Sequence, residues 1–108
     1  MTEQTKKYLA DILLAIELIE TFFEDSNDFT LYQNDSKTKS AVERQLIIIG
    51  EVINKIKKIN PLELTHSKEI INFRNRLVHA YDSIDDAIVW AIKQNHLPLL
   101  KKEVQELL

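Results

Sequence analysis

One short segment, residues 72–82, holds most of the side chains in this chain that could carry out chemistry. It contains two asparagines, two arginines, a histidine and a tyrosine: Asn72, Asn75, Arg74, Arg76, His79 and Tyr81. Metal-free cleavage of RNA needs a base for the ribose 2′-hydroxyl proton, an acid for the leaving 5′-oxygen and a fixed cation beside the phosphoryl oxygens. Imidazole titrates near neutral pH and suits the first two roles, and a planar guanidinium suits the third. The segment therefore favours phosphodiester chemistry.

Helical spacing limits which of these residues can act together. At about 100° per residue, Asn75 lies about 40° from His79 and Arg76 about 60° from it. Arg74 lies about 140° from His79. These two can meet only if the arginine curls round the helix, if the helix loosens near His79, or if a second copy supplies part of the site. A dimeric site is therefore attractive, and Arg76 remains a second candidate on geometry.

Ordinary structural roles also explain these residues. An arginine and a histidine near a helix end are commonly exposed charges that favour the helix dipole. Tyr81 would then pack its ring and keep its hydroxyl in water. His66 and His96 stand apart in the sequence, so a histidine metal site is not expected. No cofactor is expected either. Trp90 falls in an apolar pattern and is expected in the core.

The elements that position this segment are predicted to be four to five helices in an all-α, up-and-down bundle. Apolar residues recur at helical spacing in two long stripes, followed by a motif helix over about 67–80 and two later helices separated by Pro98. The first stripe is Leu9, Ile12, Ile16, Ile19 and Phe23, and the second is Val42, Leu46, Ile49, Ile53 and Ile56, with Ile48, Val52 and Ile59 beside it. The second stripe is wide enough for a core face and a partner surface.

The segments between the predicted helices contain residues that indicate caps and packing contacts. Phe29, Leu31 and Tyr32 are expected to pack back onto the bundle from a polar connection. The sequence from Asn60 to Glu63 reads as a cap with proline at the first position of a short helical turn. Ser83 is predicted to cap the fourth helix.

Gly50 is the only glycine, and it falls in the middle of the second long helix. Glycine inside a helix costs about 0.5–1 kcal/mol relative to alanine, so something should compensate. Close approach of another backbone is the expected reason.

Composition narrows the class of protein. The 108 residues suit one domain, 1–108. The absence of cysteine excludes thiolate sites, and the scarcity of glycine excludes a phosphate-binding glycine loop. The polar start predicts no signal peptide and no membrane span, so a cytoplasmic protein is expected.

Charge is unevenly distributed. The chain carries a net charge of −3, yet residues 54–79 hold six basic and two acidic side chains. Such a patch fits a partner with a few phosphates, although ordinary solvated lysines would give the same count.

Taken with their context, these residues resemble those of HEPN-domain proteins of the HepT type, the toxin half of HepT–MntA toxin–antitoxin modules. The resemblance covers nearly the whole chain and rests on the first helix, residues 41–51 of the second, Arg74-Asn75…His79-x-Tyr81, and Val89-Trp90 and Leu97-Pro98. Many relatives carry Pro-Trp before the motif helix and glycine between the histidine and the tyrosine. Here Leu62 follows the proline and Ala80 replaces the glycine.

The resemblance implies a helical homodimer with a shared cleft that acts as a metal-independent RNA endonuclease of a type VII toxin–antitoxin system. It makes Arg74 and His79 the catalytic pair, Asn75 the polar member of the motif, and Tyr81 the residue that an MntA-like nucleotidyltransferase antitoxin adenylylates. Two other hypotheses about the function remain open. One is a non-catalytic module that binds a nucleotide or the nucleotidyltransferase, and the other is a plain dimerisation domain.

Overall fold

The chain folds into helices joined by short connections. The computed structural model describes residues 1–108 apart from the side chain of Tyr81, and within that part every regular element is helical, which confirms the all-α prediction. The elements are α1 (Glu3–Thr21), α2 (Phe29–Gln33), α3 (Ser36–Ile59), α4 (Ser67–His79), the 3₁₀ turn η1 (Tyr81–Ser83), α5 (Asp86–Ala91), the π-helical segment η2 (Ile92–His96) and α6 (Leu97–Leu107).

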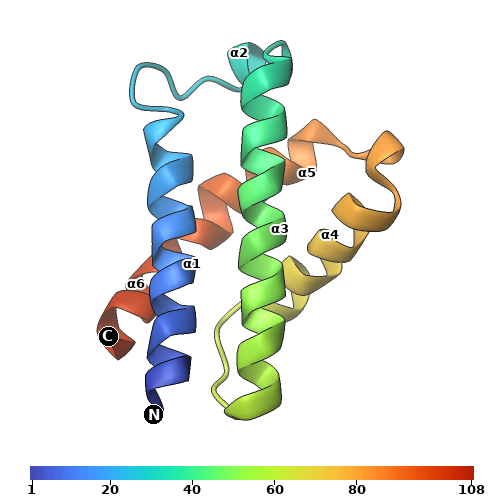
Figure 1. The fold of residues 1–108 in the computed structure, drawn as a ribbon. Coiled ribbons are helices and arrows are strands. Elements are labelled where there is room, and N and C mark those ends of the chain that lie inside the picture. Colours follow the sequence, from blue (N-terminus) through green and yellow to red (C-terminus); the bar gives the residue numbers. More distant parts are fainter.

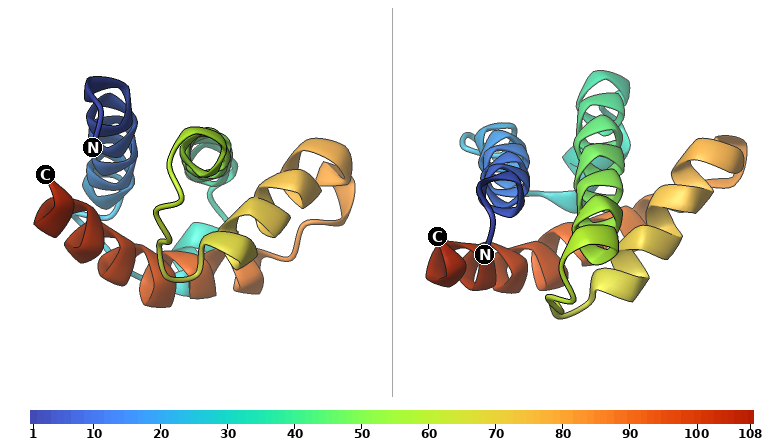
Figure 2. Two further views of the ribbon diagram at one scale, coloured as in Figure 1. Left: turned by 90° about the horizontal axis from the view of Figure 1, so that it is seen from below. Right: turned by 60° about the horizontal axis from the view of Figure 1, so that its bottom comes forward.

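The helices form a layered bundle. Helices α1 and α3 lie side by side and run in opposite directions, while α4 leaves the end of α3 at an angle (Figure 1). Helix α5, η2 and α6 follow one another as a rod that crosses one side of the α1 and α3 layer (Figure 2). Both chain ends lie at the same end of the bundle (Figure 1). No helix in the described part combines the length and apolar character needed to cross a membrane.

The predicted apolar stripes form the core. In α1, Leu9, Ile12, Ile16 and Ile19 are buried, and all five residues of the main α3 stripe are buried too. Each such side chain contributes about 1.5–3 kcal/mol relative to an exposed one. The second row of α3 divides: Val52 is buried, Ile48 is half-buried and Ile59 is exposed.

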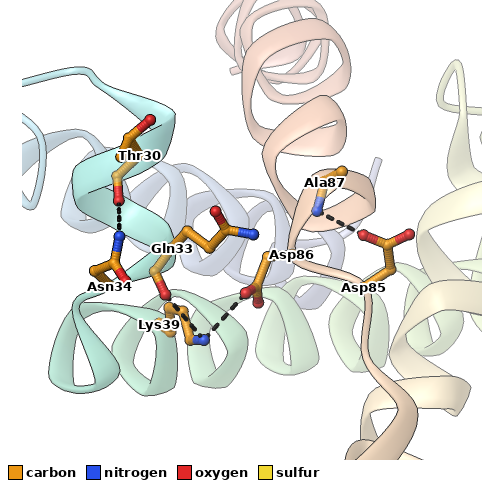
Figure 3. A network of polar contacts seen from close by, with 7 residues as sticks. All are labelled: Thr30, Gln33, Asn34, Lys39, Asp85, Asp86 and Ala87. Carbon is orange, nitrogen blue, oxygen red and sulfur yellow. Dashed lines mark hydrogen bonds and ion pairs between the residues drawn. The ribbon is translucent and has the colours of Figure 1, made fainter.

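An ion pair fastens α3 to the start of α5. The Nζ of Lys39 lies 3.0 Å from a carboxylate oxygen of Asp86 and donates a second hydrogen bond to the carbonyl of Gln33 (Figure 3). Burial and the neighbouring Asp86 raise the pKa of the Glu43 carboxyl. Burial also raises the pKa of the Tyr32 hydroxyl, which has no hydrogen-bond partner among the described residues.

Trp90 belongs to an aromatic cluster at the edge of the core. Its ring lies 5.6 Å from those of Phe23 and Tyr32 and 5.7 Å from that of Phe29. Trp90 is half-buried rather than fully enclosed, so the core prediction holds in part. Tyr32 is buried as expected, whereas Leu31 is 60% exposed and does not pack back onto the bundle.

Two connections differ from the prediction. Residues 60–64 form no helical turn, because Asn60 Oδ1 accepts a bond from the backbone N–H of Leu62 and holds the chain in a local turn instead. Ser83 does not cap the next helix, since its Oγ donates back to the carbonyl of Ala80. Asp85 takes the capping position and accepts a bond from the N–H of Ala87 at 2.8 Å (Figure 3).

The predicted last helix is present as the 11-residue α6 with Pro98 in its first turn, but a π-helical segment rather than a break separates it from α5. The five-residue segment η2 precedes α6 as π-helix, and the N–H of Leu97 donates to the carbonyl of Ile92. The π turn lets the helical path continue from α5 into α6. Pro98 lies in the first turn of α6, where the absence of its backbone N–H costs little stability.

Candidate functional site

Arg74 lies where α4 packs against α3, directly over Gly50. A Cβ added to Gly50 would lie 2.4 Å from the Cβ of Arg74, 2.8 Å from its Cγ and 3.4 Å from the carbonyl oxygen of Ile70. No residue with a side chain fits there without moving α4. The predicted close-packing role of Gly50 is confirmed, and its neighbour is a residue of the candidate site.

The guanidinium of Arg74 is held by two hydrogen bonds. Its Nη2 donates to Glu51 Oε1 at 3.1 Å, and its Nη1 donates to Asn75 Oδ1 at 2.9 Å. The Nε is buried and has no partner among the described residues. The Arg74 side chain is 27% exposed, so the group is fixed against α3 yet open on one side.

A cavity of about 210 Å³ lies beside this guanidinium, between α3 and α4. Three cationic side chains and one carboxylate share it with amide and apolar groups. Its lining residues are Gly50, Glu51, Asn54, Lys55, Lys58, Ile71, Arg74 and Asn75. We call this space the Arg74 cavity. Its positive balance suits an anion such as a phosphate.

The α3 wall of the Arg74 cavity was not predicted as part of the site, although Glu51 lies in the stretch 41–51 and Lys55 and Lys58 lie in the basic segment 54–79. Glu51, Asn54, Lys55 and Lys58 follow one another at intervals of three, one and three residues. Such spacing places polar side chains on one helix face, beside the apolar stripe. The signal was present, but only the contact with α4 shows that this face meets Arg74.

His79 does not join Arg74 within one copy. It is the last residue of α4, is exposed, and does not line the Arg74 cavity. Helix α4 continues unbroken to His79, and the N–H of Ala80 still donates to the carbonyl of Arg76 at 2.8 Å. The helix therefore does not loosen, and the arginine extends toward Glu51.

Arg76 lies on the other flank of α4. It lines an open cavity of about 480 Å³ between α4 and the α5–η2 segment, which we call the Arg76 cavity. Asn75, by contrast, is exposed and bonded to Arg74. The two arginines of the motif therefore serve different surfaces.

The other candidate residues from the sequence are Tyr81, His66 and His96. The side chain of Tyr81 lies outside the described residues. The rings of His66 and His96 lie 4.2 Å apart, so the structure brings together two histidines that stand apart in the sequence. No group of three or more histidine, aspartate or glutamate residues in the described part is arranged to hold a metal ion.

Comparisons with known proteins identify the family of the chain. The model of the ribonuclease HepT-like family matches residues 12–107. The chain therefore belongs to the HepT-like family, and its own helical packing is consistent with an all-α HEPN-like bundle.

Individual relatives cover almost the whole chain. A Thermococcus cleftensis protein named "Probable ribonuclease HepT" is 37% identical over 99% of this chain and 98% of its own length. A Methanocaldococcus jannaschii protein named as a candidate RNase is 33% identical over 95% of this chain and 90% of its own length. A candidate RNase of Caldanaerobacter subterraneus is 33% identical, over 95% and 93% of the two chains. No solved structure matches the chain significantly.

Proposed function

We propose that this protein is a metal-independent RNA endonuclease, the toxin of a type VII toxin–antitoxin system, in which Arg74 and His79 cleave RNA in a cleft shared by two copies. The observation that carries the proposal is the fixed Arg74 guanidinium beside a cationic cavity. The names of the relatives support ribonuclease activity.

Arg74 is suited to a pentacoordinate phosphoryl group. Glu51 and Asn75 occupy one Nη atom each and fix the plane of the guanidinium. Lys55 and Lys58 add positive charge on the same cavity. A cation fixed before the reaction stabilises the developing negative charge without having to reorganise.

The placement of His79 supports the proposed dimer. Of the three ways in which Arg74 and His79 could meet, a curled arginine and a loosened helix do not describe this structure. The remaining possibility is that a second copy supplies the His79 that acts with Arg74. Val78, which is 40% exposed, and Ile71, which is half-buried, flank Arg74 on α4 and offer apolar surface to that copy.

The proposed reaction is an internal transfer on the ribose. His79 takes the 2′-hydroxyl proton, the 2′-oxygen bonds to phosphorus, and the bond from phosphorus to the 5′-oxygen breaks. The departing 5′-oxygen receives a proton from a water molecule, and the protonated imidazole of the same His79 then returns a proton to the hydroxide that is left. Products are a 2′,3′-cyclic phosphate and a 5′-hydroxyl end, and atoms and charge balance with no added reactant.

Control of the toxin is assigned to Tyr81. Its backbone begins η1 directly after α4, within two residues of His79. Transfer of AMP to this hydroxyl by an MntA-like nucleotidyltransferase antitoxin would add bulk and negative charge near a site built for phosphate. RNA would then be repelled.

The test is cleavage of a labelled RNA by the purified, unmodified protein in excess chelator. Arg74→Ala and His79→Ala should each reduce cleavage by at least about a hundredfold. Arg44→Ala, an exposed arginine on α3 outside the Arg74 cavity, should leave it within about twofold.

Intact mass separates the two reasons for a negative result. Protein that cuts no RNA but carries an added AMP must first be freed of it and assayed again. Unmodified protein that binds RNA without cutting it would contradict the proposal and favour a binding module.

A further inference from the structure

The Arg76 cavity has the composition of a site for a planar ring that carries an anion. Its lining combines five apolar residues with four polar ones. The walls are formed by Phe73, Ala87, Ile88, Ala91 and Ile92, together with Glu69, Asn72, Arg76 and His96. A volume of about 480 Å³ falls within the usual range of small-molecule sites, about 300–1,000 Å³.

The polar groups are arranged along the length of the cavity. Glu69 and Arg76 are seven residues apart on α4, so their backbones are about 10 Å apart along the helix. Asn72 lies between them. The cationic end of the cavity is therefore the end near the C-terminus of α4, one turn from His79.

Two of these polar groups have no polar partner among the residues that the structure describes. Arg76 is exposed and takes part in none of the ion pairs among the described residues. His96 Nδ1 is buried with no hydrogen-bond partner in that part of the chain, and its ring forms part of the wall. The π-helical segment η2, which supplies Ile92 and His96, is of a kind often found at functional sites.

We infer that the Arg76 cavity binds one nucleotide, with the base against the apolar wall of Phe73, Ile88 and Ala91 and the phosphate at Arg76. Apolar and aromatic surfaces accept any base face, and an arginine binds a phosphate through paired hydrogen bonds. The carboxylate of Glu69 disfavours a phosphate at the opposite end, which fixes the direction of the ligand.

The source of the nucleotide rests on the proposed function. An RNA strand that crosses the exposed face of α4 would pass Asn75 and His79 between the Arg74 cavity and the Arg76 cavity. The nucleotide would then be a neighbour of the cleaved phosphate, and the cavity would set substrate preference. A free mononucleotide has the same chemistry, and the experiment has an arm for each source.

The first arm measures binding of free ligands without any cleavage. Protein labelled at isoleucine methyl groups is titrated with AMP, adenosine and ribose 5-phosphate and followed by NMR. Saturable shifts at Ile88 and Ile92 are expected with AMP, and weaker binding is expected with either fragment. The buried methyl of Ile12 in α1 should not move.

Two variants in the Arg76 cavity and one control variant test whether AMP binds there. Arg76→Gln should weaken AMP binding about tenfold, since it removes a charge-assisted contact. Ala91→Leu should weaken AMP binding by a similar factor, because the larger side chain would occupy part of the cavity without changing its charge. Lys102→Gln, which removes one exposed positive charge from α6, is the matched control and should change affinity less than about twofold. Circular dichroism confirms that each variant is folded.

The second arm uses RNA oligonucleotides with one abasic position moved along the strand. An abasic nucleotide at a single position next to the cleavage site should raise the KM and leave kcat nearly unchanged. In the Ala91→Leu protein this difference should disappear. Shifts with AMP but no abasic effect would assign the cavity to the free nucleotide.

The result that overturns the inference is the absence of saturable shifts at Ile88 and Ile92 at millimolar AMP together with no abasic effect. It is distinguishable from failure of the proposed function. RNA cleavage without nucleotide binding would reject the cavity alone, and nucleotide binding without cleavage would reject the ribonuclease alone.

Discussion

Replacing Gly50 with alanine sets two known effects against each other. Alanine inside a helix gains about 0.5–1 kcal/mol over glycine. Here the new Cβ would meet the Cβ of Arg74 at 2.4 Å, and that atom is fixed to the backbone of α4. Overpacking of this kind costs about 1–3 kcal/mol, because α4 must move as a unit. We predict a net loss of about 1 kcal/mol and a displaced Arg74.

A double-mutant cycle measures the clash directly. In an Arg74→Gly background the opposing Cβ is absent, so Gly50→Ala should stabilise the protein by about 0.5–1 kcal/mol. The free energy of unfolding of the four proteins is measured by urea titration. Gly50→Ala should also lower RNA cleavage more than its stability predicts, since the guanidinium shifts. A Gly50→Ala protein more stable than the parent, with cleavage unchanged, would refute the close-approach argument.

Three further predictions concern the polar groups around α3. Tyr32→Phe should leave the free energy of unfolding unchanged or raise it by up to about 1 kcal/mol, because the buried hydroxyl has no hydrogen-bond partner among the described residues; a clear loss would show a missed hydrogen bond. Glu43→Gln should stabilise the protein at neutral pH. The pKa of Glu43 is raised in the fold, so its ionisation opposes folding above that raised pKa, and the gain should vanish below the ordinary value of 4.5; urea titrations across pH test this. Lys39→Gln should destabilise by about 1.5 kcal/mol through loss of its bond to Asp86, and Lys37→Gln, an exposed neighbour, should change stability by less than about 0.5 kcal/mol.

The sequence predicted the parts of the fold that depend on periodicity. The stripes of α1 and α3 repeat at 3.6-residue spacing because one face must be buried, and their buried members are those the spacing indicates. The lone glycine in a long helix likewise predicted close packing, because its cost requires compensation.

The errors fall where local chemistry offers more than one solution. Ser83 and Asp85 are both good caps, and only the path of the chain after α4 makes Asp85 the cap. A proline usually ends a helix, but here one π-helical turn before Pro98 lets α5 continue into α6 without a break. Neither choice is encoded in a single window of sequence.

The candidate site was only half visible in the sequence. The motif of α4 identified Arg74 and His79, yet the Glu51 contact and both cavities depend on how α4 packs between its neighbours. Helical spacing did show that Arg74 and His79 diverge, and the packing of Arg74 against Glu51 agrees with it.

The most direct test of the shared site is a mixing experiment. Arg74→Ala and His79→Ala proteins, each inactive alone, are unfolded together and refolded so that protomers exchange. If Arg74 of one copy acts with His79 of the other, half of the dimers hold one intact site, and cleavage should return to about a quarter of the parent rate. A mixture that exchanges protomers and stays inactive would contradict a site completed by the second copy.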